Sequence, residues 1–244
     1  MLYSLMKKAI IIQGRMSSSR FPGKMMSDLA GAPLIRFVYE RCLNSKEAGI
    51  TAVATSGDKT DDQLYEYCRS GGIPVFRGSL DNVLERYVRA AEFYGAGIIC
   101  RVCGDSPFVD TSVIDEMFKM LEKTGIDYVA PVKDRCIAGL DSEVIRDIAL
   151  KAALNNTADR DCLEHVTPYI KKAENKFKIK LIDFNLRPTP LSALVLTVDY
   201  PGDLEICNRV VAVLGKRYDF TSQDIFDALL YNKDILKMER CQKL

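Results

Sequence analysis

The sequence is short of the features that mark metal-rich, membrane-bound or nucleic-acid-binding proteins. It contains a single histidine, His165, which excludes histidine-rich zinc sites and relays of several histidines. Its formal net charge is +1, so it lacks the basic excess of a general nucleic-acid or membrane-surface binder. No apolar run approaches the roughly 18 residues of a membrane span. Any anion site must therefore come from local clustering of charge.

Signals for disulfides and secretion are also missing. The eight cysteines are scattered and mostly lie in apolar periodic segments, which is typical of reduced, buried thiols in a cytosolic protein. Cys100 and Cys103 form one CxxC pair, but no second pair completes a zinc set, so we expect both to pack in the core. Residues 1–8 lack the long apolar region of a secretory signal. We therefore expect a cytoplasmic protein.

Short apolar strands alternate with amphipathic helices over the first part of the chain. The strand patterns cover 8–13, 49–55, 73–76, 97–103 and 127–130, and the helical patterns cover 34–43, 61–70, 81–94 and 111–123. Asp81 is expected to cap the third helix. The alternation predicts an α/β fold with a mostly parallel central sheet and helices on both faces. Ligands of such sheets bind outside the carboxyl ends of the strands.

The pattern changes after residue 130, although no linker rich in proline, glycine or serine divides the chain. Strands are predicted at 140–145, 178–183 and 194–199. Helices are predicted up to about residue 155, over 161–173 with a break near Pro168, over 200–214 and over 221–231. We therefore expect one domain over 1–244, with a parallel α/β half at 8–130 and a C-terminal elaboration at 131–244.

A polar loop after the first strand carries the strongest functional signal. Residues 13–24 read QGRMSSSRFPGK and include Arg15, Arg20 and Lys24. Backbone N–H groups in such a loop can form an anion nest, and the three cations can neutralise a triphosphate. The loop is neither a Walker P-loop nor a G-x-G-x-x-G dinucleotide fingerprint. A solvated basic turn is the alternative, but the composition favours a polyphosphate site.

Two aspartates at predicted strand ends indicate a metal site. Asp105 follows the strand 97–103, and Asp199 ends the strand 194–199. Each could instead cap the helix that follows. Carboxylates at the carboxyl edge of a sheet are well placed to hold Mg²⁺, and two of them over a triphosphate would suit nucleotidyl transfer.

Further motifs follow the loop 13–24 in order along the chain. They are Ala54-Thr55-Ser56, Gly78-Ser79 with 83–87, Arg101-Val-x-Gly-Asp105-x-Pro107, 139–144, 164–169 and 196–205. Together these motifs resemble the acylneuraminate cytidylyltransferase family, in particular its SpsF-like spore-coat polysaccharide group, and are similar to CMP-KDO synthetase. The loop departs from the family by Gly14 in place of alanine and by residues 18–21 in place of Ser-Thr-Arg-Leu, where Ser19 keeps the hydroxyl and Phe21 keeps the apolar anchor.

The resemblance implies a cytidylyltransferase with the Rossmann-like fold of nucleotide-diphospho-sugar transferases. It implies Mg²⁺-dependent transfer of CMP from CTP to an anionic sugar or related acceptor, with release of pyrophosphate, for surface or spore-coat polysaccharide synthesis. It also implies a nucleotide-binding half at 8–130 and a homodimer whose half 131–244 binds the acceptor and forms the dimer interface. The alternatives are a nucleotidyltransferase for another nucleotide, a glycosyltransferase of the same architecture, and an inactive nucleotide-binding subunit.

Roles for individual residues also follow from the resemblance. Arg86 could instead be a surface ion-pair partner of Glu85 or Glu92, and His165 could be structural. Asp141 and Glu143 share one face of a strand and would suit an amino or polyhydroxyl group on the acceptor. The catalytic residues would be Arg15, Lys24 and Asp105, the metal ligands Asp105 and Asp199, the nucleotide-binding residues Gln13, Gly14, Arg15, Ser17, Ser18, Ser19, Arg20, Lys24, Ser79, Asp81, Asn82 and Arg86, and the acceptor-binding residues Asp141, Glu143, Arg160, Glu164 and His165.

Overall fold

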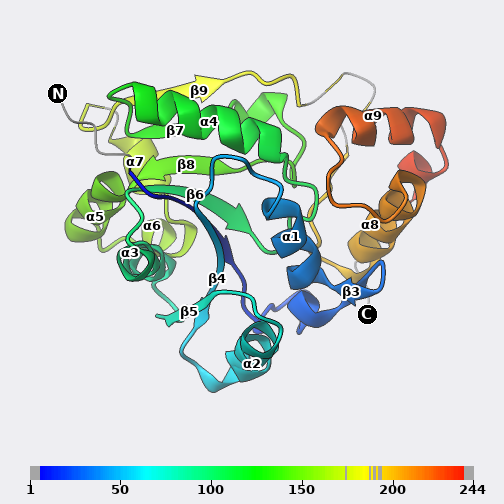
Figure 1. Ribbon diagram of the computed structural model, residues 1–244, viewed down its shortest axis with the longest axis horizontal. Helices are drawn as coiled ribbons and strands as arrows, with labels where there is room; N and C mark the ends of the chain where they lie inside the picture. The colour runs from blue at the N-terminus through cyan, green and yellow to red at the C-terminus, as the bar shows by residue number, and fades with distance from the viewer. Residues whose placement is uncertain (1–5, 174, 187, 189–190, 192–193, 239–244) are drawn as a thin grey trace.

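A twisted seven-stranded sheet runs through the centre of the molecule (Figure 1). The computed structural model describes residues 6–173, 175–186, 188, 191 and 194–238. The strand order across the sheet is β5-β4-β1-β6-β8-β7-β9. The strands are β1 (Lys8–Gln13), β4 (Ile50–Ser56), β5 (Val75–Gly78), β6 (Ile98–Cys103), β7 (Tyr128–Pro131), β8 (Glu143–Arg146) and β9 (Ile179–Ile182), with β2 (Asp28–Leu29) and β3 (Ala32–Pro33) pairing separately.

The sheet is mostly parallel, as the sequence predicts. β1 pairs in parallel with β4 and β6, β4 with β5, and β7 with β9. β8 is antiparallel to both of its neighbours, β6 and β7. The register between β6 and β8 places Glu143 directly opposite Arg101, and the two side chains form an ion pair.

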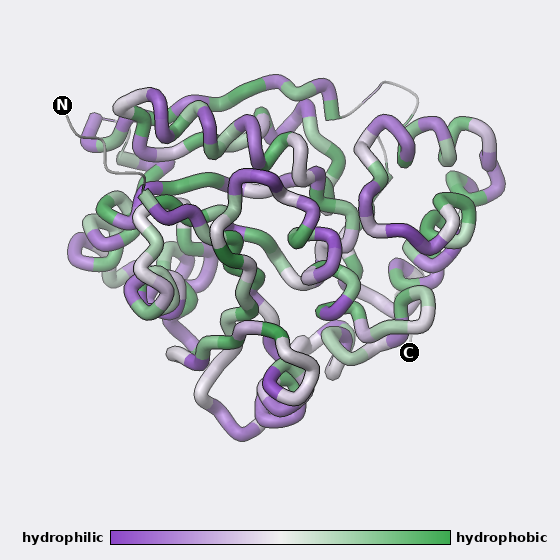
Figure 2. The backbone as a smooth tube through the Cα atoms, viewed as in Figure 1, coloured by the Kyte–Doolittle hydropathy of each residue, from purple (hydrophilic) through white to green (hydrophobic). Residues whose placement is uncertain are grey.

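Helices cover both faces of the sheet and enclose two hydrophobic cores. One core is formed with α1 (Leu34–Cys42), α2 (Asp62–Ser70), α4 (Thr111–Lys123), α8 (Pro201–Leu214) and α9 (Ser222–Tyr231). The other is formed with α3 (Val83–Tyr94), α5 (Asp147–Asn156) and α7 (Pro168–Lys172), near α6 (Arg160–His165). Figure 2 shows hydrophobic residues concentrated along the central strands, while the helices alternate between hydrophobic and hydrophilic.

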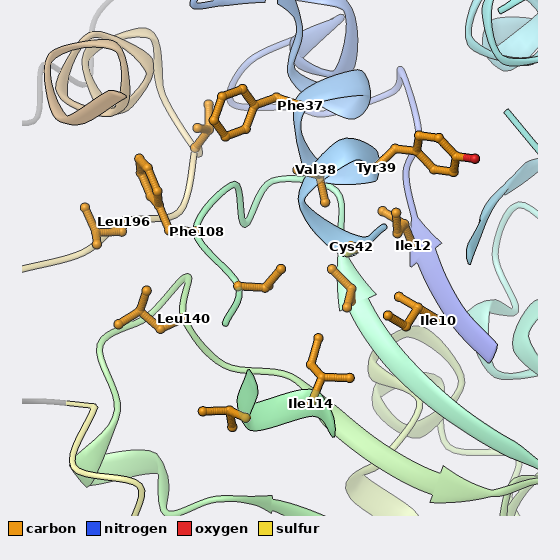
Figure 3. Close-up of a cluster of buried hydrophobic side chains, with 14 of the residues drawn as sticks. Ile10, Ile12, Phe37, Val38, Tyr39, Cys42, Phe108, Ile114, Leu140 and Leu196 are labelled. Carbon is orange, nitrogen blue, oxygen red and sulfur yellow. The ribbon is translucent and has the colours of Figure 1, made fainter. Parts of the chain in front are cut away.

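Strand β1 shows how one apolar run builds both cores. Successive side chains of a strand point to opposite faces, so Ile10 and Ile12 join the first core while Ala9 and Ile11 join the second. All four side chains are fully buried, which is typical of a parallel strand covered on both faces. In Figure 3, Ile10 and Ile12 lie beside residues of α1, including Val38.

Several local expectations need correction or completion. Asn82 caps α3 in place of Asp81, because the Asn82 side chain accepts the Glu85 N–H at 2.8 Å. The predicted helix 161–173 is divided into α6 and α7, with the break just before Pro168. Cys100 is buried in the core as expected, but Cys103 is only partly buried; Cys241 and residues 1–5 lie outside the described residues. None of the described helices is long and apolar enough to cross a membrane.

The predicted strand 194–199 is wrong. Leu196 N–H donates to Ala138 C=O at 2.8 Å, whereas Val198 N–H donates to Asp105 C=O at 2.8 Å. Because consecutive hydrogen bonds go to two different loops, no continuous ladder forms, and only an isolated bridge joins Ala138 to Val195. The segment nevertheless brings Asp199 to the carboxyl edge of the sheet, beside Asp105.

The C-terminal helices are attached through a buried arginine. Arg41, which is fully buried in α1, donates to the carbonyl groups of Tyr218, Phe220 and Val109, each at 2.6 Å. Its guanidinium also stacks on the Phe220 ring at 3.8 Å. These contacts hold the segment between α8 and α9 against the first core.

Candidate active site

The loop that follows β1 packs closely against the loop that follows β6. Gly104 N–H donates to Gln13 C=O at 2.8 Å, and Gly14 N–H donates to Ala54 C=O at 3.3 Å. A Cβ atom on Gly104 would lie 2.8 Å from Gln13 O and from Met25 Sδ, so only glycine allows this approach. The close packing brings the cationic loop and Asp105 to one edge of the sheet.

Lys24 lies between the two aspartates that the sequence singles out. Its Nζ is 2.7 Å from Asp105 Oδ2 and 3.5 Å from Asp199 Oδ1, and it donates to Val198 C=O at 2.8 Å. The lysine is 7% exposed, so the three groups interact with little screening by solvent. The structure thus brings together a predicted catalytic lysine and both predicted metal ligands.

The donor set fits a divalent metal only with help from a ligand. Asp105 and Asp199 supply carboxylate oxygens, the type of ligand that Mg²⁺ prefers. Among the described residues, no group of three or more His, Cys, Asp or Glu side chains could hold a metal ion. Mg²⁺ commonly keeps water molecules and completes its shell with substrate phosphates. The pair of aspartates therefore suits a metal that arrives with a polyphosphate.

The two arginines of the loop contact acidic residues from the second half of the chain. Arg20 Nη2 is 2.8 Å from Asp199 Oδ1, and Arg15 Nη2 is 3.1 Å from Glu164 Oε1. Both arginine side chains are substantially exposed. Exposed ion pairs of this kind are weak, so these cations are available to a stronger anion such as a phosphate.

A buried aspartate that the sequence analysis missed fixes the start of the loop. Asp61 is fully buried, and its Oδ1 accepts the Met16 N–H at 2.6 Å. Its Oδ2 accepts the Ser56 N–H at 3.0 Å and a further bond from the Ser56 hydroxyl. Asp61 therefore ties the residue after Arg15 to the end of β4. In the sequence it marked only the start of a helix, which explains why it was missed.

A cavity of about 290 Å³ lies over these strand ends. We call it the nucleotide cavity. The predicted residues Ser17, Ser79, Asp81, Asn82 and Asp199 are absent from its described wall. Asp199 is connected to the cavity through its contacts with the wall residues Lys24 and Arg20. The wall contains, from the predicted site, Gln13, Gly14, Arg15, Ser18, Ser19, Arg20, Lys24, Arg86, Asp105, Glu164 and His165, together with Met25, Val83, Arg101, Cys103 and Gly104.

Arg86 is a buried wall residue and not a surface ion-pair partner. It is 2% exposed, and its closest acceptor is Leu80 C=O at 3.4 Å from Nη2. Its Nε is buried with no partner in the described structure. Glu85 and Glu92 instead contact Arg89. Burial lowers the pKa of Arg86, as expected for a cation with little compensation.

A second cavity of about 690 Å³ adjoins the first, and Arg101 and His165 belong to the walls of both. We call it the acceptor cavity. Asp141, Glu143 and His165 lie in its wall, whereas Glu164 lines only the nucleotide cavity and the exposed Arg160 lines neither described wall. Residues from both halves of the chain therefore contribute to each cavity.

Glu143 is held by four neighbouring side chains. Its carboxylate accepts from Tyr128 Oη at 2.6 Å, Thr167 Oγ1 at 3.0 Å, Lys171 Nζ at 2.6 Å and Arg101 Nη1 at 2.9 Å. Burial alone would raise its pKa, but Arg101 and Lys171 outweigh burial and lower it to about 2. Glu143 is thus an ionised anchor within the protein, with little capacity left for a ligand.

A strained turn places His165 at the boundary between the cavities. Val166, fully buried, has φ 73° and ψ −55°, which is rare for a β-branched residue. Thr167 N–H donates to His165 C=O at 2.9 Å, which makes the three residues a γ-turn. The turn directs Thr167 to Glu143 and leaves His165 in the wall shared by both cavities.

A mostly parallel sheet that carries a cationic loop, two carboxylates and two adjoining cavities at its carboxyl edge defines an α/β protein suited to bind a polyphosphate ligand. The chain belongs to the cytidylyltransferase family, whose model matches residues 9–216. It is therefore a nucleotidyltransferase of the type that uses CTP, as the sequence motifs predict.

Individual relatives agree with this assignment. The chain is 31% identical over 234 residues to the spore coat polysaccharide biosynthesis protein SpsF of Bacillus subtilis, covering 92% of this chain and 94% of that protein. It is 34% identical over 127 residues to the 3-deoxy-manno-octulosonate cytidylyltransferase of Geobacter sulfurreducens, covering 51% and 49%. The solved structure of a cytidylyltransferase from Leptospira borgpetersenii superposes with a TM-score of 0.87 at 28% identity, covering 97% and 99%. The resemblance to SpsF and CMP-KDO synthetase is confirmed.

Proposed function

We propose that this protein transfers CMP from CTP to an anionic sugar or related acceptor, with Mg²⁺, and releases pyrophosphate. One observation carries the proposal: the nucleotide cavity and the acceptor cavity share Arg101 and His165 in their walls. A nucleotide in the smaller cavity and an acceptor in the larger one would therefore meet at these two residues. Such a meeting point is what a direct attack of the acceptor on the α-phosphate requires.

The loop 13–24 would hold the triphosphate. Lys24, Arg15 and Arg20 would neutralise negative charge as it moves to the pyrophosphate leaving group. The present partners of Arg15 and Arg20 are the exposed carboxylate of Glu164 and the partly buried carboxylate of Asp199, which a triphosphate with more charge would displace. Arg86 would add a buried cation at the floor of the same cavity.

Asp105 and Asp199 would hold Mg²⁺. When bound, the ion would polarise the α-phosphate and help to orient the attacking oxygen. Lys24 would remain beside both carboxylates and balance their charge. Asp61 would keep the backbone at Met16 in place, so that Arg15 and the serines face the phosphates.

The charges in the acceptor cavity support an anionic acceptor. The buried Glu143 carboxylate contacts two cations, Arg101 and Lys171, so the immediate surroundings of Glu143 carry one surplus positive charge. Over the whole described wall, three cations and three carboxylates balance, so the support comes from this local group alone. An amino group on the acceptor, which Asp141 and Glu143 suggested from the sequence, has less support because Glu143 is already compensated. Asp141 has one oxygen engaged with the Gly139 N–H at 3.0 Å.

Pyrophosphate release from CTP, with Mg²⁺ and a panel of sugar acids, tests the proposal. We expect release with at least one acid, its loss on chelation of the metal, and its loss in Asp105→Asn. Faster release from UTP or GTP would favour another nucleotide, and transfer from a nucleotide sugar would favour a glycosyltransferase. CTP binding without release for any acceptor would favour an inactive nucleotide-binding subunit.

We further propose that residues 8–130 mainly bind the nucleotide, that 131–244 mainly bind the acceptor, and that the second half forms a homodimer interface. β9 is an edge strand, which supports an interface there; its Leu181 is 54% exposed and also lines the acceptor cavity. The likeness to SpsF supports a role in surface or spore-coat polysaccharide synthesis in the cytoplasm. Sedimentation of the wild-type protein and of Leu181→Glu tests the dimer, since a monomeric wild type would contradict it.

A further inference from the structure

We propose that Arg101 is a substrate-binding residue whose unused N–H groups bind an anionic oxygen at the junction of the two cavities. The inference rests on the proposed function for the identity of the two substrates. The sequence motif that includes Arg101 gives this arginine no role, and the inference does not use that motif. The inference depends instead on how the buried arginines of this chain satisfy their hydrogen-bond donors.

Two buried arginines outside the cavities are well supplied with acceptors. Arg41 donates to three backbone carbonyl groups. Arg146 donates to the carbonyl groups of Leu121, Thr124 and Ile126 and contacts Met6 Sδ. These arginines act as structural ties, because a buried guanidinium must pair its donors to offset the loss of water.

Arg101 differs from both in having a single described acceptor, whereas a buried Nε without a described partner is a feature that it shares with Arg41. An arginine side chain presents several N–H donors in a fixed fork. In the described part of the chain, Glu143 is the only side chain or backbone group that accepts from the Arg101 guanidinium, at 2.9 Å from Nη1. The side chain is 15% exposed, and its Nε is buried with no described hydrogen-bond partner. Arg101 therefore retains donors that the described part of the protein leaves unpaired.

The position of Arg101 indicates where those donors are used. Arg101 lies in the walls of both cavities, whereas Arg41 and Arg146 lie in neither. Arg86, a buried arginine with one distant acceptor, lines the nucleotide cavity. Of these arginines, the two with the fewest described hydrogen-bond acceptors, Arg101 and Arg86, are thus the ones that line a cavity. This favours ligand binding over a structural role for Arg101.

Glu143 positions Arg101 for this task. The two residues are direct cross-strand partners on β6 and β8. Tyr128, Thr167 and Lys171 hold the Glu143 carboxylate from other directions, so it cannot turn to accept more donors from Arg101. One edge of the guanidinium is thereby fixed, and the remaining donors are directed away from it. Glu143 acts here as a positioning residue.

Charge favours an anionic partner over a neutral one. One carboxylate balances two adjacent cations, Arg101 and Lys171, and the surplus positive charge is partly desolvated. An anionic oxygen at the junction would compensate it with a charge-assisted hydrogen bond. That oxygen can belong to the α-phosphate of the nucleotide or to an acidic group of the acceptor, since both meet there.

Two pairs of matched probes separate these sources. Calorimetry would measure the dissociation constants of CMP and cytidine, which differ by the α-phosphate. With CMP bound, it would then measure those of 3-deoxy-manno-octulosonate and its methyl ester, which differ by the negative charge. In each pair, the ratio of the two constants reports the binding of the anionic group alone.

In Arg101→Gln we expect at least one ratio to fall by about 10-fold or more, as loss of a charge-assisted bond requires. Arg101→Lys should give a smaller loss, because it keeps the charge without the fork. Arg146→Gln removes a buried arginine outside the cavities and should lower the thermal unfolding midpoint while both ratios stay within about 2-fold.

The proposal is overturned if both ratios of Arg101→Gln and Arg101→Lys match the wild type, or if Arg146→Gln changes them equally. It is also overturned if the wild type binds CMP no more tightly than cytidine and binds the sugar acid no more tightly than its methyl ester. If Arg101→Gln does not fold, Arg101→Lys alone decides. A wild type that shows the expected ratios but releases no pyrophosphate would leave the role of Arg101 intact and contradict the proposed function.

Discussion

The Lys24 ammonium lies 2.7 Å from the Asp105 carboxylate, although the residues belong to loops that follow different strands. β1 and β6 are adjacent and parallel, so their carboxyl ends, and the loops beyond them, meet at one edge of the sheet. Asp199 reaches the same lysine from a third segment. A buried cation between two carboxylates can balance their charge and interact with a polyphosphate.

Replacement of Lys24 by methionine should lower kcat/KM for CTP by about 100-fold or more, because a fixed cation beside the phosphates is lost. Steady-state pyrophosphate release would measure it. Lys8→Met is the matched control, since Lys8 is equally buried and contacts Glu47 at 2.7 Å and Glu122 at 2.9 Å, remote from the site. Equal losses of kcat/KM in both variants would contradict a specific role for Lys24.

Replacement of Asp61 by asparagine should raise the dissociation constant of CTP by about 10-fold. Met16 N–H and Ser56 N–H bond to different carboxylate oxygens, and an amide replaces one of these acceptors with an NH2 donor. Titration calorimetry with CTP would measure the change.

Asp115→Asn provides the control for Asp61. Asp115 is also buried and accepts from the Ser45 hydroxyl and from the N–H groups of Lys46 and Glu47. Both variants should lose about 1–3 kcal/mol in the free energy of unfolding. Only Asp61→Asn should weaken CTP binding, and a similar weakening in Asp115→Asn would mean that the effect is one of general stability.

Replacement of Gly139 by alanine should destabilise the fold by about 3 kcal/mol or more, through a clash and an unfavourable φ together. Gly139 has φ +102°, and a Cβ atom there would lie 2.5 Å from Leu196 C. Urea unfolding would measure the change. Gly72→Ala, with φ +69° and no atom within 4 Å of the new Cβ, isolates the backbone term of about 1–2 kcal/mol. Equal losses in the free energy of unfolding for Gly139→Ala and Gly72→Ala would show that Leu196 does not obstruct a Cβ atom at position 139.

Acid should destabilise the protein partly through Glu143. Its pKa is lowered from 4.5 to about 2 on folding, so its contribution is complete above the unfolded pKa and is lost as pH falls from about 5 to about 2. The free energy of unfolding should fall by about 3 kcal/mol from this group over that range. Urea unfolding at several pH values would measure it, and an equally steep fall in Glu143→Gln would assign the loss to other carboxylates.

The sequence identified those parts of the site that depend on local pattern. Residues 13–24 combine cations, hydroxyl groups and glycines directly after a buried strand, and no tertiary contact is needed to recognise an anion loop. The alternation of strands and helices indicated a parallel sheet, whose geometry places loop ends on one edge. Asp105 and Asp199 could be paired for the same reason, although Asp199 follows an irregular segment and not a strand.

Other features were decided only by the tertiary structure, because they depend on partners that are distant in sequence. Asp61 gained its role from Met16 and Ser56, and Arg86 proved to be a buried wall residue only when α3 packed on the sheet. The antiparallel β8 set Glu143 against Arg101 and turned a predicted acceptor-binding acid into an anchor. Local composition determined which chemistry the chain carries, whereas long-range packing determined which of its charges remain available to a ligand.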